Sequence, residues 1–412
     1  MDRSGLKRVE AAIALAMLLA ASGCAPRQGQ GAASHIRAQH KAEDRSSRAE
    51  VSTTSPPVLP FKEYALPGSY QVTGYTDKYA LLTLETHREY PSAELRLLSL
   101  ADGRARPLIL MPVESGKRFD ILGGKLSNEV VAWEEVSPGE ADRPGEASWR
   151  LYASRYDPAR GLTATPTLVD SSDKGRRRRP LFGVDGHAVI WTTNDQRVSG
   201  GRVVERLAGR VGTFDVGTGE RRQLLADSSG FGTLSVSEHR VLVTRFFSGR
   251  HELLTLDLAN GRTSRVSLGT GEPSHFPAAG DGWMSWAAFR SGSEWPDLYV
   301  RDPGGKASLL GRDSLDAVFA GPYVFFESNE PSSAPRDRSH YGSIWGMRLG
   351  TGRKFRLLLT DVSAEGWWQT PLSQGRVEDV FVVFNDLSPW NEGRDARTLV
   401  RVYRLSSASS AR

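Results

Sequence analysis

From Val58 onward, short runs of β-branched, aromatic and leucine residues recur along the chain, and Gly, Asp, Asn, Ser and Pro separate them. No long stretch carries the apolar spacing of an amphipathic helix. Short strands bounded by turn residues are typical of all-β proteins. The pattern therefore predicts an all-β domain over residues 58–405.

The apolar runs belong to a repeat whose first strand carries a bulky residue near its middle and often follows a glycine. Seven such strands are predicted, at 79–84, 130–133, 187–191, 240–243, 283–286, 323–326 and 380–384. Trp133, Trp191, Trp286 and Trp345 lie in strands and are expected to pack in the core.

A second strand and a glycine turn follow each of the first six of these strands. The turn glycines are Gly103, Gly161, Gly219, Gly261, Gly305 and Gly352, at steps of 58, 58, 42, 44 and 47 residues. Glycine turns between alternating strands are hairpin signals. Periods of this length match β-propeller blades of four strands.

The last repeat lacks its outermost strand. Its second strand, 398–405, is followed only by the polar segment 406–412, which we expect to be disordered. At the other end of the domain, residues 60–66 form a strand that precedes the first repeat. This strand completes the last repeat if the sheets close into a ring, which leaves no long exposed edge. We therefore predict a seven-bladed propeller of four-stranded antiparallel blades, closed by the N-terminal strand.

The segment Pro296-Asp297-Leu298-Tyr299-Val300-Arg301-Asp302, followed by Gly304-Gly305, resembles the strand and turn of bacterial TolB-like repeats. The strand 253–258 with Ala259-Asn260-Gly261 is a weaker copy. The domain thus resembles TolB-like and WD-repeat-like β-propellers over residues 58–405. The resemblance implies a fold, and a fold alone does not assign a function.

The N-terminal segment carries a different pattern. Charged residues up to Glu10 precede an apolar run from Ala11, and small residues then lead to Cys24, the single cysteine. Residues 1–23 resemble the signal peptide and lipobox of bacterial lipoproteins, although Ala21 stands where leucine is commonest. The resemblance implies that Cys24 is lipid-modified and becomes the N-terminus. The run is too short to span a bilayer; the alternative is a buried helix.

Residues 24–57 are rich in Gly, Ala, Ser, Gln and charge, so we expect a flexible tether. The net charge of +5 is spread along the chain and does not suggest a nucleic-acid partner. With its only cysteine assigned to the anchor, the chain has no disulfide and depends on its apolar core. We expect a monomer that is held at a bacterial membrane and faces the periplasm or the cell exterior.

The chain contains no phosphate-binding loop and no Gly-x-Ser-x-Gly elbow. The segment His251-Glu252-Leu253-Leu254-Thr255 lacks the second histidine of a zinc helix and lies in a predicted strand. We therefore predict no catalytic residue, metal or cofactor from motifs. Catalysis stays open, because acids and histidines from different blades can converge.

The loops carry the candidate contacts. Four long loops, 137–147, 194–209, 328–342 and 385–397, are expected on one face of the propeller, where functional residues are often held. Acceptors at the strand exits could bind a cation or a sugar hydroxyl, or could simply be solvated: Glu134, Asn194, Asp195, Glu327, Asn329, Asn385 and Asp386. Trp367, Trp368, Trp390 and Trp295 could stack on a sugar ring or anchor a protein.

A cationic run links the second and third predicted blades: Lys174, Arg176, Arg177, Arg178 and Arg179. Five cations this close repel one another, so we expect a solvated loop or a contact with an anionic surface.

The sequence thus predicts a membrane-anchored extracytoplasmic propeller that binds a protein or a cell-envelope component. The alternative is a hydrolase or lyase that acts on cell-envelope polysaccharide at the loop-rich end of the channel. We favour binding over catalysis because no catalytic motif is present.

Overall fold

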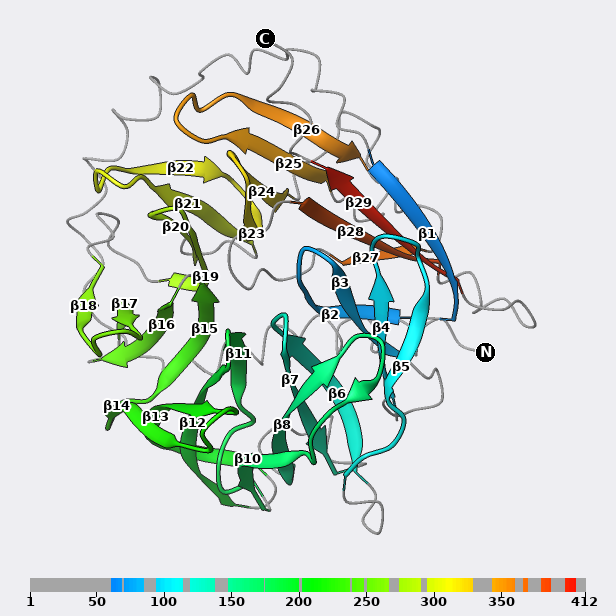
Figure 1. The fold of residues 1–412 in the computed structure, drawn as a ribbon. Helices are drawn as coiled ribbons and strands as arrows, with labels where there is room; N and C mark the ends of the chain where they lie inside the picture. The colour runs from blue at the N-terminus through cyan, green and yellow to red at the C-terminus, as the bar shows by residue number, and fades with distance from the viewer. Residues whose placement is uncertain are drawn as a thin grey trace, which may run out of the picture. The chain divides into compact units, whose positions relative to one another are not determined.

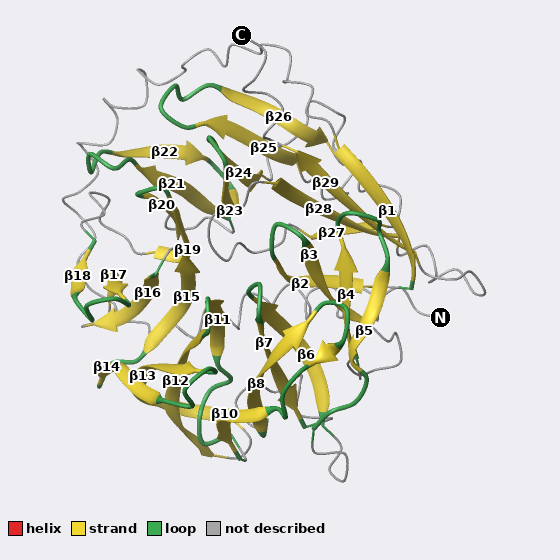
Figure 2. Cartoon of the chain, viewed as in Figure 1, coloured by secondary structure: helices red, strands yellow, loops and turns green. Residues whose placement is uncertain are grey.

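The computed structural model describes residues 61–68, 70–84, 94–113, 119–137, 147–173, 175–199, 202–237, 239–247, 250–266, 274–289, 295–328, 343–359, 366–369, 379–386 and 397–404. These residues form strands, turns and loops, with no helix among them (Figure 2). No described helix could therefore cross a membrane. Cys24, where the sequence predicts lipidation, lies outside the described residues.

Six sheets are each built from strands that follow one another along the chain, as predicted (Figure 1). Strands that follow one another in a sheet pair antiparallel, apart from one short extra strand in the second sheet, so the chain runs back and forth from the innermost strand outward. The first three sheets are β2 (Tyr70–Tyr75), β3 (Tyr79–Leu84), β4 (Leu95–Ser99), β5 (Ala105–Ile109); β6 (Asp120–Leu126), β7 (Val130–Val136), β8 (Trp149–Asp157), β9 (Gly161–Leu162), β10 (Thr167–Ser172); and β11 (Leu181–Asp185), β12 (Ala188–Ser199), β13 (Arg202–Asp215), β14 (Arg221–Asp227).

The next three sheets repeat the same order. They are β15 (Phe231–Ser237), β16 (Arg240–Phe247), β17 (Arg250–Asp257), β18 (Thr263–Arg265); β19 (Ser274–Gly280), β20 (Trp283–Phe289), β21 (Pro296–Arg301), β22 (Ala307–Gly311); and β23 (Ser314–Ala320), β24 (Tyr323–Ser328), β25 (Ser343–Arg348), β26 (Lys354–Leu359). This is the propeller arrangement of four-stranded antiparallel blades that the glycine period predicted.

One further sheet combines the two ends of the domain. It contains β27 (Gly366–Gln369), β28 (Asp379–Asp386), β29 (Arg397–Arg404) and, on its outer edge, β1 (Phe61–Pro67). Strand β1 pairs antiparallel with β29 from Phe61↔Tyr403 to Pro67↔Arg397. Glu63 also accepts hydrogen bonds from Arg401 at 2.7 and 3.0 Å.

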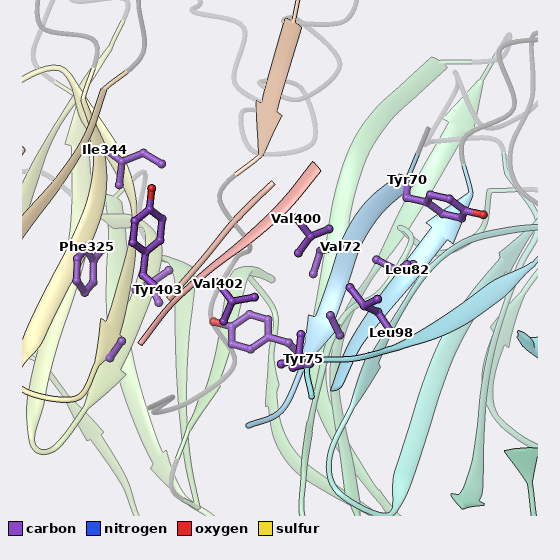
Figure 3. Close-up of a cluster of buried hydrophobic side chains, with 14 of the residues drawn as sticks. Tyr70, Val72, Tyr75, Leu82, Leu98, Phe325, Ile344, Val400, Val402 and Tyr403 are labelled. Carbon is purple, nitrogen blue, oxygen red and sulfur yellow. The ribbon is translucent and has the colours of Figure 1, made fainter. Parts of the chain in front are cut away.

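Apolar side chains hold neighbouring sheets together. One buried cluster draws on β1, on β2–β4, on β23–β26 and on β29. Figure 3 shows Val400 and Val402 of β29 near Val72 and Tyr75, with Tyr403 on the side of Phe325 and Ile344. Burying these residues removes apolar surface from water, which is the main stabilising contribution to such an interface.

Three of the four tryptophans that were expected in the core are buried. Trp133 and Trp286 are fully buried, and Trp191 is nearly so. Trp133 stacks on Tyr152 and Trp286 stacks on Tyr299. Trp345 is only half-buried, with Arg356 over its ring.

Five of the innermost strands, β2, β6, β15, β19 and β23, carry a β-bulge, whereas β11 and β27 do not. The register shifts between Phe231 and Leu234 in β15, between His275 and Ala278 in β19, and between Leu315 and Val318 in β23. Bulges bend a strand, leave a residue unpaired and often lie beside functional sites. The bulge in β23 carries the candidate site.

Candidate functional site

In each sheet, the innermost strand begins and the second strand ends at the same end, which we call the loop end. The candidate site lies at the loop end of one sheet. Hydrogen bonds link this end of one sheet to the next: Arg179, just before β11, reaches Glu134 of β7, and Asn194 of β12 reaches Phe231 of β15. Both contacts join sheets that are consecutive along the chain. Glu327, a predicted contact residue, lies at the loop end of β24.

The structure places Asp316 beside Glu327. Asp316 occupies the bulge of β23, and Glu327 pairs with Leu315, the residue before it. Burial raises the pKa of the Asp316 carboxyl to about 7. Burial and the charge of Asp316 together raise the pKa of Glu327 well above its ordinary value. Two carboxyls that disfavour each other's ionisation titrate as a pair, and this pair retains protons near neutral pH.

Asp316 has an unusual backbone conformation and a buried side-chain oxygen without a hydrogen-bond partner among the described residues. Its φ is +54°, in the left-handed region that residues other than glycine rarely adopt. Its Oδ1 atom is buried and has no hydrogen-bond partner among the described residues. An unpaired buried polar atom and a left-handed backbone each cost free energy. The left-handed φ belongs to the bulge, because Phe276 has a φ of +50° in the bulge of β19, whereas the unpaired Oδ1 atom belongs to Asp316 itself.

Equivalent positions in neighbouring sheets show what the fold needs there. Asp316 lies four residues before the last residue of β23 that pairs across the hairpin turn, and the residues at the same place are Thr233 in β15 and Phe276 in β19. Glu327 lies four residues after the first paired residue of β24, and its counterpart in β16 is Thr244. The Thr233 and Thr244 hydroxyls are 3.2 Å apart, within hydrogen-bond distance. The fold thus accepts a neutral, satisfied pair, so the acidic pair is a property of this sheet alone among the three.

Glu134 is the opposite case among the predicted acceptors. Its side chain is 5% exposed and accepts two hydrogen bonds from Arg179, at 2.8 and 2.9 Å. Both carboxylate oxygens are used, which is the bidentate geometry that arginine favours. Glu134 thus links two blades in this structure.

Two more predicted acceptors also serve the scaffold. The side chain of Asn194 donates to the carbonyl of Phe231 at 2.6 Å and accepts from its N–H at 2.7 Å. Asp195 forms an ion pair with Arg210 at 3.1 Å. These contacts occupy the polar groups that the sequence offered to a ligand.

The cationic run is only partly free for an anionic surface. The Nη1 atom of Arg177 donates to both carboxylate oxygens of Asp170, at 2.9 and 3.0 Å, and the guanidinium lies over the Trp149 ring. Arg179 is engaged by Glu134, as above. Arg176 is exposed, and Lys174 lies outside the described residues. Arg177 and Arg179 are thus half-buried and paired with carboxylates of the domain, whereas contact of the run with an anionic surface stays a prediction.

The predicted aromatic contacts fall mostly where the structure describes only the backbone. Trp367 and Trp368 lie in β27, opposite Asn385 and Phe384 of β28. Asp386 closes the same ladder opposite Gly366. The backbone thus brings Trp367 and Asn385 together. Trp390 and Asn329 lie outside the described residues, and Trp295 is half-buried.

Sequence reasoning missed Asp316. The only signal was an acid directly before the apolar run 317–320, which alone does not mark a site. It also missed Lys125 of β6, whose pKa burial lowers to about 8. In the part of the chain that the structure describes, no group of three or more His, Cys, Asp or Glu residues could hold a metal ion.

No family model and no curated protein match this chain. Solved structures do. An oligogalacturonate lyase in complex with manganese matches with a TM-score of 0.52 and 13% identity, over 86% of this chain and 96% of that one. An oligogalacturonate lyase from Vibrio parahaemolyticus matches with a TM-score of 0.51 and 11% identity, over 84% and 95%.

The fold is a β-propeller. TolB from Acinetobacter baumannii also matches, over 83% of this chain and 80% of that one, at 14% identity and a TM-score of only 0.39. At sequence identities this low, structural similarity supports a shared fold and does not support a shared activity.

Proposed function

We propose that this protein is a lipid-anchored, extracytoplasmic β-propeller that binds a protein or a cell-envelope component at its loop end. Cys24 carries the lipid and residues 24–57 form the tether to a bacterial membrane. The observation that carries the binding role is the Asp316–Glu327 pair at the loop end, in which the buried Asp316 Oδ1 atom has no hydrogen-bond partner among the described residues. A buried polar atom without a partner costs free energy and calls for an explanation, which a bound partner would supply.

The ring is proposed to close with seven blades, with β1 completing the last one. Three facts support this. Strand β1 pairs with β29 along its whole length. The innermost strands of the first six sheets touch in succession, from β2 through β6, β11, β15 and β19 to β23, and β28, the second strand of the last sheet, touches both β23 and β2. The cluster in Figure 3 joins both ends of the domain.

The binding role is tested by replacing both acids with their amides, Asp316→Asn with Glu327→Gln. The lipidated protein is used to recover partners from solubilised envelopes, and recovery is compared between wild type and variant. We expect the variant to lose the partner while folding normally. The control is Asp102→Asn on an exposed turn, which should recover the partner fully. Equal recovery by both variants would remove the pair from the binding role.

The anchor is tested separately with Cys24→Ala. This variant should leave the membrane fraction and appear unprocessed, because no thiol is present to accept the lipid. A variant that stays with the membrane contradicts the proposed anchor while leaving the acidic site untouched.

A second candidate, a hydrolase or lyase acting on envelope polysaccharide, rests on the same pair. A carboxyl that keeps its proton near pH 7 is suited to donate it to a leaving oxygen. Release of reducing ends from purified envelope polysaccharide, lost in Glu327→Gln, would favour this function. Binding without product release favours the first.

A further inference from the structure

A pocket of about 200 Å³ lies at the end of the first sheet opposite its loop end, which we call the turn end. It is lined by the β2–β3 turn with Asp77 and Lys78, by the turn that follows β4, and by Lys62 of β1. This volume is several times the roughly 30 Å³ that one water molecule takes in the liquid. It is smaller than the roughly 300–1,000 Å³ of a drug-sized site. The pocket therefore suits a small charged group.

Hydrogen bonds hold the walls of this pocket against one another. The Tyr64 hydroxyl of β1 donates to the Leu100 carbonyl at 2.5 Å, and the Leu100 N–H donates to the Lys78 carbonyl at 2.9 Å. The Lys62 ammonium donates to the Ala101 carbonyl at 3.3 Å. These bonds join β1, the edge strand of the last sheet, to two turns of the first sheet. The walls of the pocket are therefore fixed by the fold itself.

Two lysines and one aspartate set the charge of the pocket. Lys62 and Lys78 outnumber Asp77, so the lining carries a net +1 (two minus one). All three side chains are exposed, and none of them forms an ion pair within the part of the chain that the structure describes. An ammonium carries three N–H donors, of which Lys62 uses one on Ala101. The remaining donors suit the oxygens of a phosphate, and the carboxylate suits an ammonium group.

The pocket lies where the chain enters the domain. Lys62 follows Phe61, the first residue of β1, and residues 24–57 before it form the proposed tether. The Phe61 side chain is 50% exposed. Lysines are attracted to lipid headgroups, and an apolar ring can enter the boundary between headgroups and acyl chains. A tether that joins the domain at this end keeps headgroups at a high local concentration near the pocket.

We propose that this pocket binds the headgroup of a phospholipid that carries both a phosphate and an ammonium group. Lys62 and Lys78 hold the phosphate, and Asp77 faces the ammonium. The inference rests on the proposed membrane anchor for access to lipid and is independent of the Asp316–Glu327 pair. A headgroup held at the turn end directs the opposite, loop end of the first sheet away from the membrane.

The test is calorimetric titration of the full lipidated chain, solubilised in detergent, with soluble headgroups. Glycerophosphoethanolamine should bind most tightly. Glycerophosphoglycerol should bind about fivefold more weakly because it has no ammonium to face Asp77, and Asp77→Asn should remove this difference. No binding of glycerophosphoethanolamine, or tighter binding of glycerophosphoglycerol, would overturn the proposal. Inorganic phosphate that binds as tightly as glycerophosphoethanolamine would identify a site for the free anion and overturn the lipid source.

The matched variants remove the same charge from different places. Lys62→Gln with Lys78→Gln removes both cations of the pocket, and Arg262→Gln with Lys306→Gln removes two cations from exposed turns. The pocket variant should bind glycerophosphoethanolamine at least about tenfold more weakly, whereas the turn variant should bind it like wild type. Equal binding by the pocket variant and wild type would refute the site.

Two further proteins separate this site from the proposed function. Cys24→Ala should bind glycerophosphoethanolamine like wild type even after it leaves the membrane fraction, because the pocket does not contain the lipid. The Asp316→Asn, Glu327→Gln protein should also bind it normally. Loss of headgroup binding there, together with an unchanged pocket variant, would place the binding at the loop end and refute the pocket.

Discussion

Glu134 and Glu327 end the second strands of two blades, and both were predicted to face a ligand, yet their environments are opposite. Glu134 is buried against Arg179, which donates to both of its oxygens. Glu327 lies beside a second acid, and the pKa values of both carboxyls are raised. A satisfied ion pair holds two blades together, whereas two neighbouring acids that disfavour each other's ionisation cost stability. The surroundings decide which of the two a glutamate becomes.

The largest effect should come from breaking the satisfied pair. Arg179→Ala leaves the Glu134 carboxylate buried without its partner, and we expect a loss of about 3 kcal/mol in the free energy of unfolding. Urea denaturation measures it. The control is Arg222→Ala, which removes the exposed partner of Glu220 and should cost less than about 0.5 kcal/mol. Equal effects of both variants would mean that the Glu134 pair contributes no more than a surface contact.

The acidic pair should make stability fall as pH rises. The unfolded chain loses the Asp316 proton near pH 4, and the folded protein holds it to about pH 7. Because the folded state binds more protons between these values, stability declines from about pH 4 to pH 7 and then levels. Glu327 adds to the decline in the same direction.

The double variant Asp316→Asn with Glu327→Gln should flatten this decline. Between pH 4 and pH 7, we expect its free energy of unfolding to fall by about 2 kcal/mol less than that of wild type, a figure reduced for screening by solvent. Thermal unfolding at a series of pH values is the measurement. Thr233→Val in the equivalent sheet carries no acid and should leave the slope unchanged. An identical slope in the amide variant and in wild type would show that the pair is ionised in the folded protein.

The smallest effect should come from the backbone at the bulge. Glycine adopts the φ of +54° at position 316 without steric cost. We therefore expect Asp316→Gly to raise the free energy of unfolding by about 1 kcal/mol at neutral pH while abolishing partner binding. Thr233→Gly, in the same place of β15, should lower it by about 1 kcal/mol because it removes the hydroxyl contact with Thr244. A loss of stability in both variants would mean that Asp316 has a structural role.

Much of the fold was accessible from the sequence because its signals are local. Alternating apolar residues and turn glycines such as Gly103 and Gly261, both left-handed in the structure, mark strands and turns within a few residues of each other. The repeat period then indicated the blades, and the unmatched strand near Pro60 indicated which part of the chain could pair with β29.

The site was less accessible because it depends on contacts between blades. The sequence shows Glu134, Asn194 and Glu327 as similar acceptors at strand exits. Only the fold brings Arg179 to Glu134 and the Phe231 backbone to Asn194. It likewise brings Asp316 to Glu327.

The sequence by itself thus determined the strands, their order and the residues available at the loop end, since strand alternation and turn chemistry are properties of neighbouring residues. The tertiary structure alone decided which of those residues have a partner of opposite charge or a hydrogen-bond partner and which lie beside a like charge. A pKa or an unsatisfied oxygen reflects desolvation and partners that come from other blades, and the linear order of the chain does not contain them.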